Sequence, residues 1–220
     1  MKQGYEEPYK IMLPIRMPTI LRLDGKSFHA FTRGMERPFD KEFMSMMDQL
    51  ALYLCHECQT AQFAYIQSDE ISILLHPYKK LDTEGFFANE VQKMVSISAG
   101  LASAWMSLEY KRTAVFDSRV FVLPESEVVN YFLWRQQDCT RNSISMVAQS
   151  LYSHKELIEK NNAMKQEMIF QKDINWGKLP VNKRRGRCII RTEDGLVIDQ
   201  SPPIFSKKRS YIENLLKTDE

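Results

Sequence analysis

Hydrophobic and polar residues follow two different periods along the chain, and these periods predict an alternation of strands and helices. Short apolar runs bounded by turn residues predict strands, whereas apolar residues three and four positions apart predict helices. The predicted strands span residues 18–25, 63–66, 71–75 and 114–123, and the predicted helices span residues 40–58 and 83–110. Asp40 is placed to cap the first helix. This order is typical of the split βαβ, or ferredoxin-like, fold: an α+β arrangement in which an antiparallel sheet carries two helices on one face.

The second part of the chain predicts an extension that is helical first and basic second. Helical sequence runs from residue 126 to about residue 171. Two short apolar runs, residues 188–191 and 196–198, flank a turn and predict a hairpin. Because 220 residues lie near the upper end of a single domain, we expect a core at residues 1–135 and an extension at residues 136–220, packed together as one unit.

The charged residues are distributed unevenly, although the formal net charge is only +2. Residues 1–175 carry 20 basic and 22 acidic side chains, whereas residues 176–220 carry 10 and 6. Six bases and no acid fall within residues 176–192, a density that can follow a phosphate backbone, and Trp176 could stack on a base. The alternative is a solvated face beside a strand. With 44% hydrophobic and 26% charged residues, the composition excludes a disordered or fibrous chain.

Neither a membrane segment nor a metal-binding cysteine pattern is predicted. The longest charge-free stretch, residues 94–108, is too short and too polar to span a bilayer. The first residues lack the apolar stretch of a secretory signal, so we expect a cytoplasmic protein. Cys55 and Cys58 could form a redox pair or half of a zinc site, but no second paired knuckle exists. We interpret the four cysteines as ordinary reduced thiols.

Two acids stand where neighbouring strands of the predicted sheet end. Asp24 follows the first strand, and Asp69 lies in the tight connection of the central hairpin. In the split βαβ sheet these strands are adjacent, so the two carboxylates converge and repel each other unless a cation is present. Mg²⁺ held by one or two carboxylates and substrate phosphates meets that need, and Gly25 leaves room for close backbone approach. The alternative is that these acids are simply turn residues.

Further matches make the sequence recognisable as similar to the tRNA(His) guanylyltransferase superfamily. Four blocks carry the resemblance, in the family's order and at roughly its spacing. They are LRLDGKSFH at residues 21–29, QSDE at residues 67–70, FDSRV at residues 116–120 and WRQQD at residues 134–138. The blocks cover about residues 15–145. The resemblance implies a palm domain like that of nucleic-acid polymerases, which agrees with the predicted strand order, and assigns residues 1–135 to the palm-like catalytic core.

The resemblance also implies a nucleotidyltransferase that adds nucleotides to the 5′ end of tRNA in the 3′-to-5′ direction. A 5′ monophosphate would first be activated with ATP or GTP. The 3′ hydroxyl of an incoming nucleoside triphosphate would then attack the activated phosphate and expel its leaving group. Two Mg²⁺ ions, nucleoside triphosphates and tRNA are the implied cofactors and partners, and the implied assembly is a homotetramer. Positioning and charge neutralisation by metal do most of the work in such transfers.

The matching blocks imply roles for individual residues. Asp24 and Asp69 would bind both metal ions and Gly25 would offer its carbonyl, with Asp24, Asp69 and Glu70 as the catalytic acids. Nucleotide contacts are implied for Asp24, Gly25, Lys26, Ser27, Phe28, His29, Arg37, Ser68 and Asp69. Arg37 is included because RPFD at residues 37–40 resembles the family's basic-Pro-x-Asp motif, and a solvated loop is the alternative for Lys26 and Arg37. Glu70 could tune the neighbouring metal ligand or be a solvated hairpin acid. Arg119, Arg135 and Asp138 could form a buried ion network or contact the substrate.

One departure from the family pattern bears on the reaction. Eukaryotic guanylyltransferases that act on tRNA(His) carry HINN just after the WRQ block, where this chain has TRNS at residues 140–143. The chain therefore resembles the guanylyltransferase-like branch, which adds templated nucleotides and is proposed to repair 5′-truncated tRNAs. A tRNA(His) guanylyltransferase proper is the alternative within the family. Beside an RNA enzyme, the basic segment is interpreted as an RNA contact, made by Lys183, Arg184, Arg185 and Arg187.

Two functions outside the family are also considered. A cyclase of the diguanylate kind would share the carboxylate pair, but its GGDEF turn is replaced here by QSDEI at residues 67–71. A non-catalytic RNA-binding protein would use the basic segment alone. The presence of both Asp24 and Asp69 favours an enzyme.

Overall fold

A six-stranded antiparallel sheet forms the centre of the computed structural model, which describes residues 1–218. The strands are β1 (Thr19–Gly25), β2 (Ala61–Gln67), β3 (Glu70–Leu75), β4 (Phe116–Val122), β5 (Arg187–Thr192) and β6 (Gly195–Asp199). Their order across the sheet is β4-β1-β3-β2-β5-β6, and every neighbouring pair is antiparallel. The first four strands have the order of the split βαβ fold, so the predicted fold class is confirmed.

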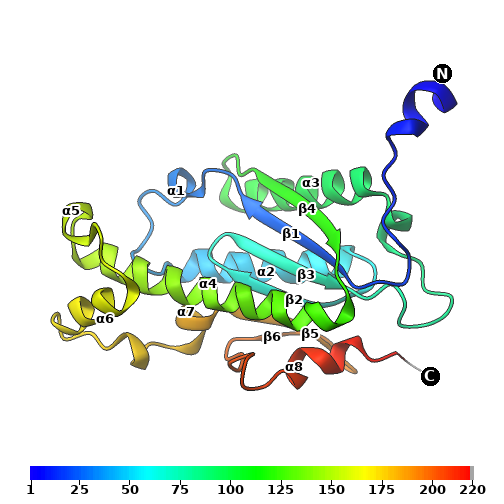
Figure 1. Ribbon diagram of the computed structural model, residues 1–220. Coiled ribbons are helices and arrows are strands. Elements are labelled where there is room, and N and C mark those ends of the chain that lie inside the picture. The colour runs from blue at the N-terminus through cyan, green and yellow to red at the C-terminus, as the bar shows by residue number, and fades with distance from the viewer. Residues whose placement is uncertain (219–220) are drawn as a thin grey trace.

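Helices cover both faces of this sheet. The α-helices are α1 (Phe28–Phe31), α2 (Lys41–Glu57), α3 (Val91–Tyr110), α4 (Glu125–Leu151), α5 (His154–Leu157), α6 (Asn162–Phe170), α7 (Val181–Arg185) and α8 (Ser210–Glu213). Short turns of other helix types are η1 (Lys2–Glu6), η2 (Glu7–Tyr9), η3 (Phe86–Asn89), η4 (Trp176–Lys178) and η5 (Asn214–Leu216). Helices α2 and α3 lie behind the sheet in Figure 1, whereas α4 crosses its near face. Among the helices described for residues 1–218, none combines the length and hydrophobicity that a bilayer span requires.

The alternation of side chains along β1 decides which groups face which helix layer. Leu21 and Leu23 are fully buried in the core shared with α2 and α3, whereas Ile20 belongs to the core beneath α4. Successive side chains of a strand point to opposite faces. Arg22 and Asp24 therefore share the α4 side of the sheet with Ile20. This alternation places polar side chains on the face of the sheet that α4 crosses.

The long helix expected over residues 83–110 begins later, at Val91. The residues before it form the turn η3, in which Phe87 and Ala88 have left-handed backbone angles, with φ of 47° and 49°. The N-terminal arm (residues 1–17) determines this start, because the backbone N–H of Val91 donates to the carbonyl of Ile11 at 2.9 Å. A tertiary contact thus replaces the first helical turns that the local pattern predicts.

The extension completes the sheet of the core. Helix α4 runs without a break across the boundary expected at residue 135, and β5 pairs with β2, with Phe63 opposite Ile190. The hairpin of β5 and β6 therefore adds two strands to the four of the core. The last two residues of the expected extension lie outside the described part of the chain.

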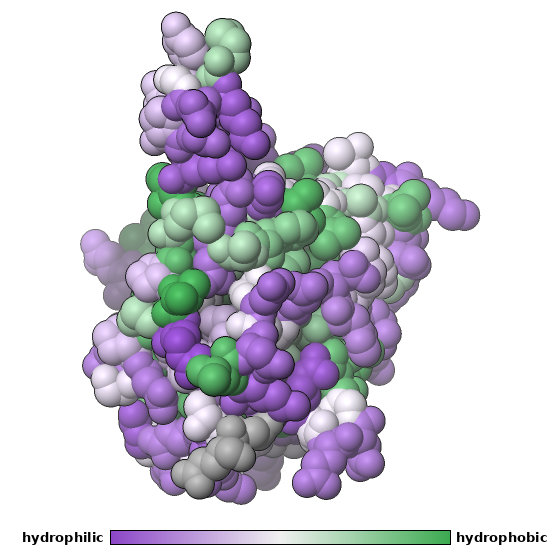
Figure 2. Space-filling view, turned by 90° about the vertical axis from the view of Figure 1, so that its right-hand side faces the viewer, coloured by the Kyte–Doolittle hydropathy of each residue, from purple (hydrophilic) through white to green (hydrophobic). Residues whose placement is uncertain are grey.

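The N-terminal arm projects from the body of the molecule (Figure 1). Figure 2 shows apolar side chains in a band below this projection. The arm's exposed large apolar residues are Met1, Tyr5, Tyr9, Ile11, Met12 and Ile15. Such a concentration of exposed apolar side chains on one segment is typical of an interaction surface.

All four cysteines are free and buried, as expected for ordinary reduced thiols. Burial raises the pKa of Cys58 to about 12 and raises that of Cys55 further. Within residues 1–218, no group of three or more His, Cys, Asp or Glu side chains is arranged to hold a metal ion. The zinc alternative therefore finds no ligand set in the described part of the chain.

The cap of α2 gives a first testable prediction. The Asp40 carboxylate accepts the backbone N–H groups of Phe43 at 2.8 Å and Glu36 at 2.9 Å, and these bonds hold its pKa below its ordinary value. Asp40→Ala should lower the free energy of unfolding by about 1 kcal/mol at neutral pH, measured in urea. Because the folded pKa is depressed, this difference should be present above the ordinary aspartate pKa of about 3.9 and shrink as the pH falls through the lower folded value.

Asp40→Asn is the matched control for this prediction. An asparagine caps a helix without carrying a charge. It should keep most of the stability, and that stability should not depend on acid titration of residue 40. An Asp40→Ala protein as stable as the wild type at neutral pH would contradict the capping role.

Candidate active site

The sheet brings Asp24 and Asp69 to one edge. Asp24 lies near the end of β1, where it is paired with Glu70, the first residue of β3. Asp69 precedes Glu70 in the two-residue turn between β2 and β3, where Ser68 has a left-handed φ of 48°. Both aspartates line one cavity of about 610 Å³. The predicted convergence of the two carboxylates therefore follows from strand order and register.

Burial and neighbouring negative charges raise the pKa of both carboxylates. Burial raises the pKa of Asp24, and the nearby charge of Glu70 raises it further. Burial likewise raises the pKa of Asp69, with the charge of Asp24 adding to the effect. Two acids and the carbonyl of Gly25 are hard oxygen donors, which Mg²⁺ prefers together with phosphate oxygens. The residues present therefore fit a Mg²⁺ site that a triphosphate would complete.

Glu70 is the centre of a buried ion network behind this pair. The Arg22 guanidinium donates to its carboxylate at 2.6 Å, and Arg135 donates through Nε at 2.8 Å and through a terminal nitrogen at 2.7 Å. Arg135 also bonds Asp138 at 2.9 Å. The alternative of Glu70 as a solvated hairpin acid is therefore wrong. The network expected for Arg135 and Asp138 is present, whereas Arg119 lies outside it, 55% exposed and paired with Asp117.

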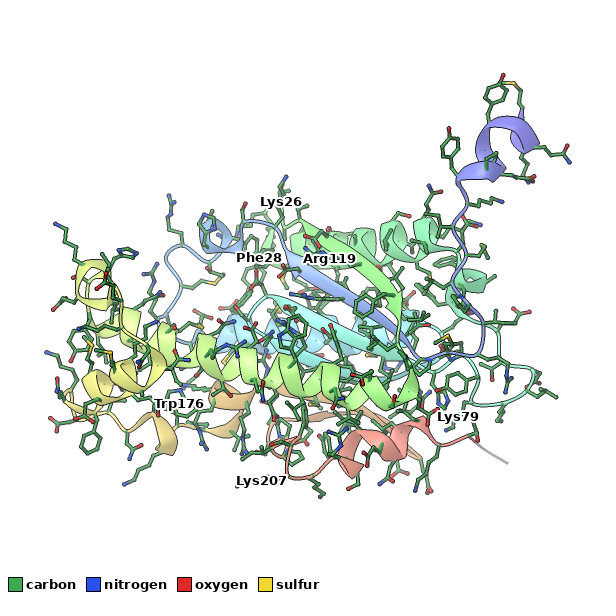
Figure 3. All side chains as sticks on the ribbon, viewed as in Figure 1. Lys26, Phe28, Lys79, Arg119, Trp176 and Lys207 are labelled. Carbon is green, nitrogen blue, oxygen red and sulfur yellow. The ribbon has the colours of Figure 1, made fainter. Side chains whose placement is uncertain are left out.

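The loop after β1 forms one wall of the cavity. Gly25, Ser27, Phe28 and His29 line it, whereas Lys26 does not line it and is exposed (Figure 3). A Cβ atom on Gly25 would lie 2.3 Å from the Phe28 ring. Gly25 is thus required for packing, whatever its carbonyl binds.

The Phe28 ring is part of an aromatic cluster beneath the site. It stacks on Phe31 at 4.8 Å between ring centroids and packs against Phe116 at 4.9 Å. Its side chain is buried, so the contact that it can offer a nucleotide is an apolar floor rather than an exposed stacking face.

The opposite wall comes from the extension, where motif reasoning had named few residues. Helix α4 contributes Asn142, Ser143, Met146, Gln149 and Ser150, and the segment around α7 contributes Asn182, Lys183, Gly186 and Arg187. Arg37, on the loop before α2, also lines the cavity. The family match points to Arg37 and to Asn142, and the basic run points to Lys183 and Arg187 as RNA contacts rather than cavity residues. The remaining residues carry no local pattern, because their place depends on how the extension packs on the core.

The basic segment docks against α4 through its backbone carbonyls. Ser143 donates to the carbonyl of Lys183 at 2.6 Å, and Thr140 donates to that of Arg184 at 3.3 Å. The Tyr65 hydroxyl donates to the carbonyl of Arg185 at 2.8 Å. The three basic residues are half-buried, so the segment is packed against the body of the protein and keeps part of its charge at the surface.

Two residues of this segment depart from the expected RNA contacts. Arg187 is 3% exposed and its guanidinium pairs with Asp48, so the expectation of a surface RNA contact there is corrected: the residue joins β5 to α2. Trp176 is half-buried, and its indole N–H donates to Ser143 at 3.0 Å. It helps to dock the segment and is not a free stacking surface.

Comparisons with known proteins agree with this site. The sequence profile of the family described as tRNAHis guanylyltransferase matches residues 1–124. The chain is 29% identical to a probable tRNA(His) guanylyltransferase of Dictyostelium discoideum, over 97% of this chain and 90% of that protein. It is similar to a bacterial tRNA(His) guanylyltransferase-like protein solved in complex with ATP, with 45% identity, a TM-score of 0.93 and coverage of 97% and 96%. A bacterial guanylyltransferase-like protein in complex with GTP gives 41% identity, a TM-score of 0.86 and the same coverage.

The close approach of Gly25 and Phe28 gives a second prediction. Gly25→Ala should lower the free energy of unfolding of the metal-free protein by about 1–3 kcal/mol, because the added methyl overlaps the Phe28 ring. Gly100→Ala is the control, since nothing lies within 4 Å of a Cβ there. In a double-mutant cycle, Phe28→Leu should relieve part of the cost of Gly25→Ala. Strictly additive losses would show that the ring is not the obstacle.

Proposed function

This chain belongs to the tRNA(His) guanylyltransferase family, whose members are nucleotidyltransferases, and we propose that it repairs 5′-truncated tRNAs by templated 3′-to-5′ addition. The observation that carries the proposal is a carboxylate pair, Asp24 and Asp69, on the wall of a cavity that also receives the cations Arg37 and Lys183. The TRNS sequence at residues 140–143 and the likeness to bacterial guanylyltransferase-like proteins favour repair over the dedicated addition of one guanosine.

The cavity is proposed to bind ATP or GTP for activation and the incoming nucleoside triphosphate for addition. Two similar bacterial proteins were solved in complex with ATP and with GTP, and a volume of about 610 Å³ is within the usual size of a ligand site. His29, Ser68 and Arg37 are the polar groups proposed to orient the nucleotide, because they line the cavity. For Lys26, which does not line it, a triphosphate contact would require the side chain to turn inward.

Asp24, Asp69 and the Gly25 carbonyl are proposed to hold two Mg²⁺ ions. When bound, Mg²⁺ neutralises charge on the triphosphate and on the reacting phosphate. In the addition step a bond forms between the 3′ oxygen of the incoming nucleotide and the activated 5′ phosphorus. The bond to the activating group breaks, that group leaves with the bonding electron pair, and the hydroxyl proton passes to water. Arg37 and Lys183 are proposed to bind the triphosphate.

Glu70 is proposed to act through other residues rather than on the substrate. Its carboxylate accepts hydrogen bonds from both Arg22 and Arg135, and it does not line the cavity. Its negative charge raises the pKa of Asp24. We propose that it holds β1, β3 and α4 in the arrangement that keeps the two aspartates together.

Contacts outside the cavity complete the proposal. Arg184 and Arg185 are proposed as RNA contacts, since both remain partly exposed. A homotetramer is proposed, supported by the exposed apolar residues of the N-terminal arm. The cytoplasmic location stays a prediction.

The repair activity is tested by incubating the protein with Mg²⁺, nucleoside triphosphates and a tRNA that lacks its first nucleotide. We expect extension to full length on monophosphorylated tRNA in the presence of ATP or GTP. A tRNA(His) offered under the same conditions distinguishes a dedicated guanylyltransferase, which would prefer it and add one guanosine without a template. The absence of any product with truncated tRNAs, whether monophosphorylated or triphosphorylated, would contradict the proposed function.

Asp69→Asn should reduce this extension at least about a hundredfold, because it removes one charged ligand of the proposed metal site. The affinity for tRNA, measured by filter binding without metal, should stay nearly unchanged. Asp194→Asn, in the exposed turn between β5 and β6, is the matched control and should extend normally. An equal loss of extension and tRNA binding in Asp69→Asn would point to a structural role for the acid.

A variant of Lys183 tests whether this residue of the basic segment binds the triphosphate or the tRNA. Lys183→Ala should raise the KM for the nucleoside triphosphate about tenfold and change tRNA affinity little, because the residue lines the cavity. Lys178→Ala is the control, since Lys178 is exposed on the same segment and does not line the cavity. The reverse pattern, with weaker tRNA binding and an unchanged KM for the triphosphate, would restore Lys183 to the RNA contacts.

A further inference from the structure

We infer that Trp134, Arg22 and Arg119 form a stacking platform for the 5′-terminal nucleotide of the substrate RNA, on the side of the carboxylate pair away from the nucleotide cavity. This inference rests on the proposed function, because it names where the RNA end lies when it meets the cavity. The three side chains come from helix α4, strand β1 and strand β4, and none of them lines the cavity.

Trp134 presents a firmly held aromatic surface to solvent. Its residue is 47% exposed, the most exposed of the three tryptophans. The Arg135 guanidinium carbon lies 4.3 Å from the indole centroid, and the Tyr131 ring packs edge-on at 5.9 Å. Arg135 in turn is locked by Glu70 and Asp138. An indole that is preorganised and half exposed can stack on any base, which is how single-stranded nucleic acids are held without sequence preference.

Two guanidinium groups lie on this side of the sheet, one beside the indole and held by Glu70, the other exposed and suited to a phosphate. The Arg22 guanidinium lies 5.9 Å from the indole centroid, and Arg22 is paired across the sheet with Arg119. Arg119 is 55% exposed, and its bond to Asp117 at 3.3 Å joins two exposed groups. Exposed ion pairs of this kind are weak, so Arg119 can exchange its carboxylate for a phosphate. The combination of an aromatic face and cations favours RNA over a protein partner.

The position of the platform relative to the carboxylates also favours the RNA end. Arg22 lies two positions before Asp24 on β1, and Arg119 is opposite Arg22 on β4. Along helix α4, Trp134 lies about one turn before Asp138, and the cavity residues Asn142 and Ser143 lie about one turn after it. The carboxylate pair thus lies between the platform and the cavity, where two reactants approaching from opposite sides would meet.

The surface near the carboxylates offers few alternatives for this role. In Figure 1, no helix crosses the near face of β4. Lys183, Arg184 and Arg185 lie on the α7 side, where they are half-buried against α4. An RNA end that approached over α7 would have to enter through the wall of the nucleotide cavity.

The platform is tested first by fluorescence, in a Trp105→Phe, Trp176→Phe protein that keeps Trp134 as its single tryptophan. A 5′-truncated tRNA should quench the Trp134 emission, because a base stacks on the indole, whereas ATP or GTP alone should leave the emission nearly unchanged. Filter binding confirms that the tRNA is bound. Unchanged emission with saturating tRNA would overturn the inference, as would equal quenching by a nucleoside triphosphate alone.

Matched variants test the energetic role. Trp134→Ala should raise the KM for truncated tRNA about tenfold and leave the KM for the triphosphate within about twofold, while Trp134→Phe keeps most of the affinity. Phe170→Ala, which removes an aromatic residue 60% exposed on α6, should change neither constant. Arg119→Ala should weaken tRNA binding and reduce its salt dependence. Arg209→Ala should do neither, although Arg209 forms an equally long exposed pair with Glu213.

The outcomes also separate this inference from the proposed function. A Trp134→Ala protein in which both KM values rise together would show that the residue acts by supporting the Arg135 and Glu70 network, and would overturn the platform. If tRNA quenches Trp134 but no nucleotide is ever added, the platform stands and the repair activity fails. If nucleotides are added normally by Trp134→Ala with an unchanged KM for tRNA, the activity stands and the platform fails.

Discussion

The site depends on one buried carboxylate, which connects two strands of the sheet to the helix that crosses them. Glu70 accepts hydrogen bonds from Arg22 on β1 and from Arg135 on α4, so a single charged group joins two neighbouring strands to the helix that crosses them. Removal of one partner from such a buried pair typically costs about 3–5 kcal/mol, because the remaining charge is left without compensation. The position of α4 then determines the far wall of the cavity, through Asn142 and Ser143. This network thus holds the two aspartates beside Glu70 in place, although neither aspartate belongs to it.

Local patterns in the sequence predicted the elements of the core but not the tertiary contacts that complete it. The strand order and the convergence of Asp24 and Asp69 follow from alternation and from the split βαβ arrangement, because hairpin and crossover geometry leaves few alternatives. The late start of α3 depends on the N-terminal arm, and the pair between Arg187 and Asp48 joins residues 139 positions apart. No periodic pattern encodes such contacts. For the same reason, the family blocks indicated Phe28 and Arg37 but not Lys183, whose place in the cavity depends on the docking of α7.

The charge pattern of the basic segment predicted a nearby polyanion, but it did not predict which groups the segment contacts. Its bases lie next to a site suited to a polyanion, as the uneven charge distribution suggests. Their backbone carbonyls accept hydrogen bonds from Tyr65, Thr140 and Ser143, and one guanidinium is consumed by Asp48. The segment therefore serves first as the connection between α4 and β5. Of its bases only Lys183 and Arg187 line the cavity, and the charge of Arg187 is balanced by Asp48.

Helix α4 has a consequence for the proposed addition of nucleotides, if it is repeated on one RNA. Its rise of about 1.5 Å per residue separates Trp134 from Asn142 by about 12 Å along a rigid axis. A spacing of this kind does not change as the RNA grows. After each addition, the new 5′ end would therefore have to withdraw from the carboxylates by one nucleotide before another triphosphate enters. Translocation would then be a sliding of bases over Trp134, so a weak and sequence-indifferent grip serves the cycle better than a tight one.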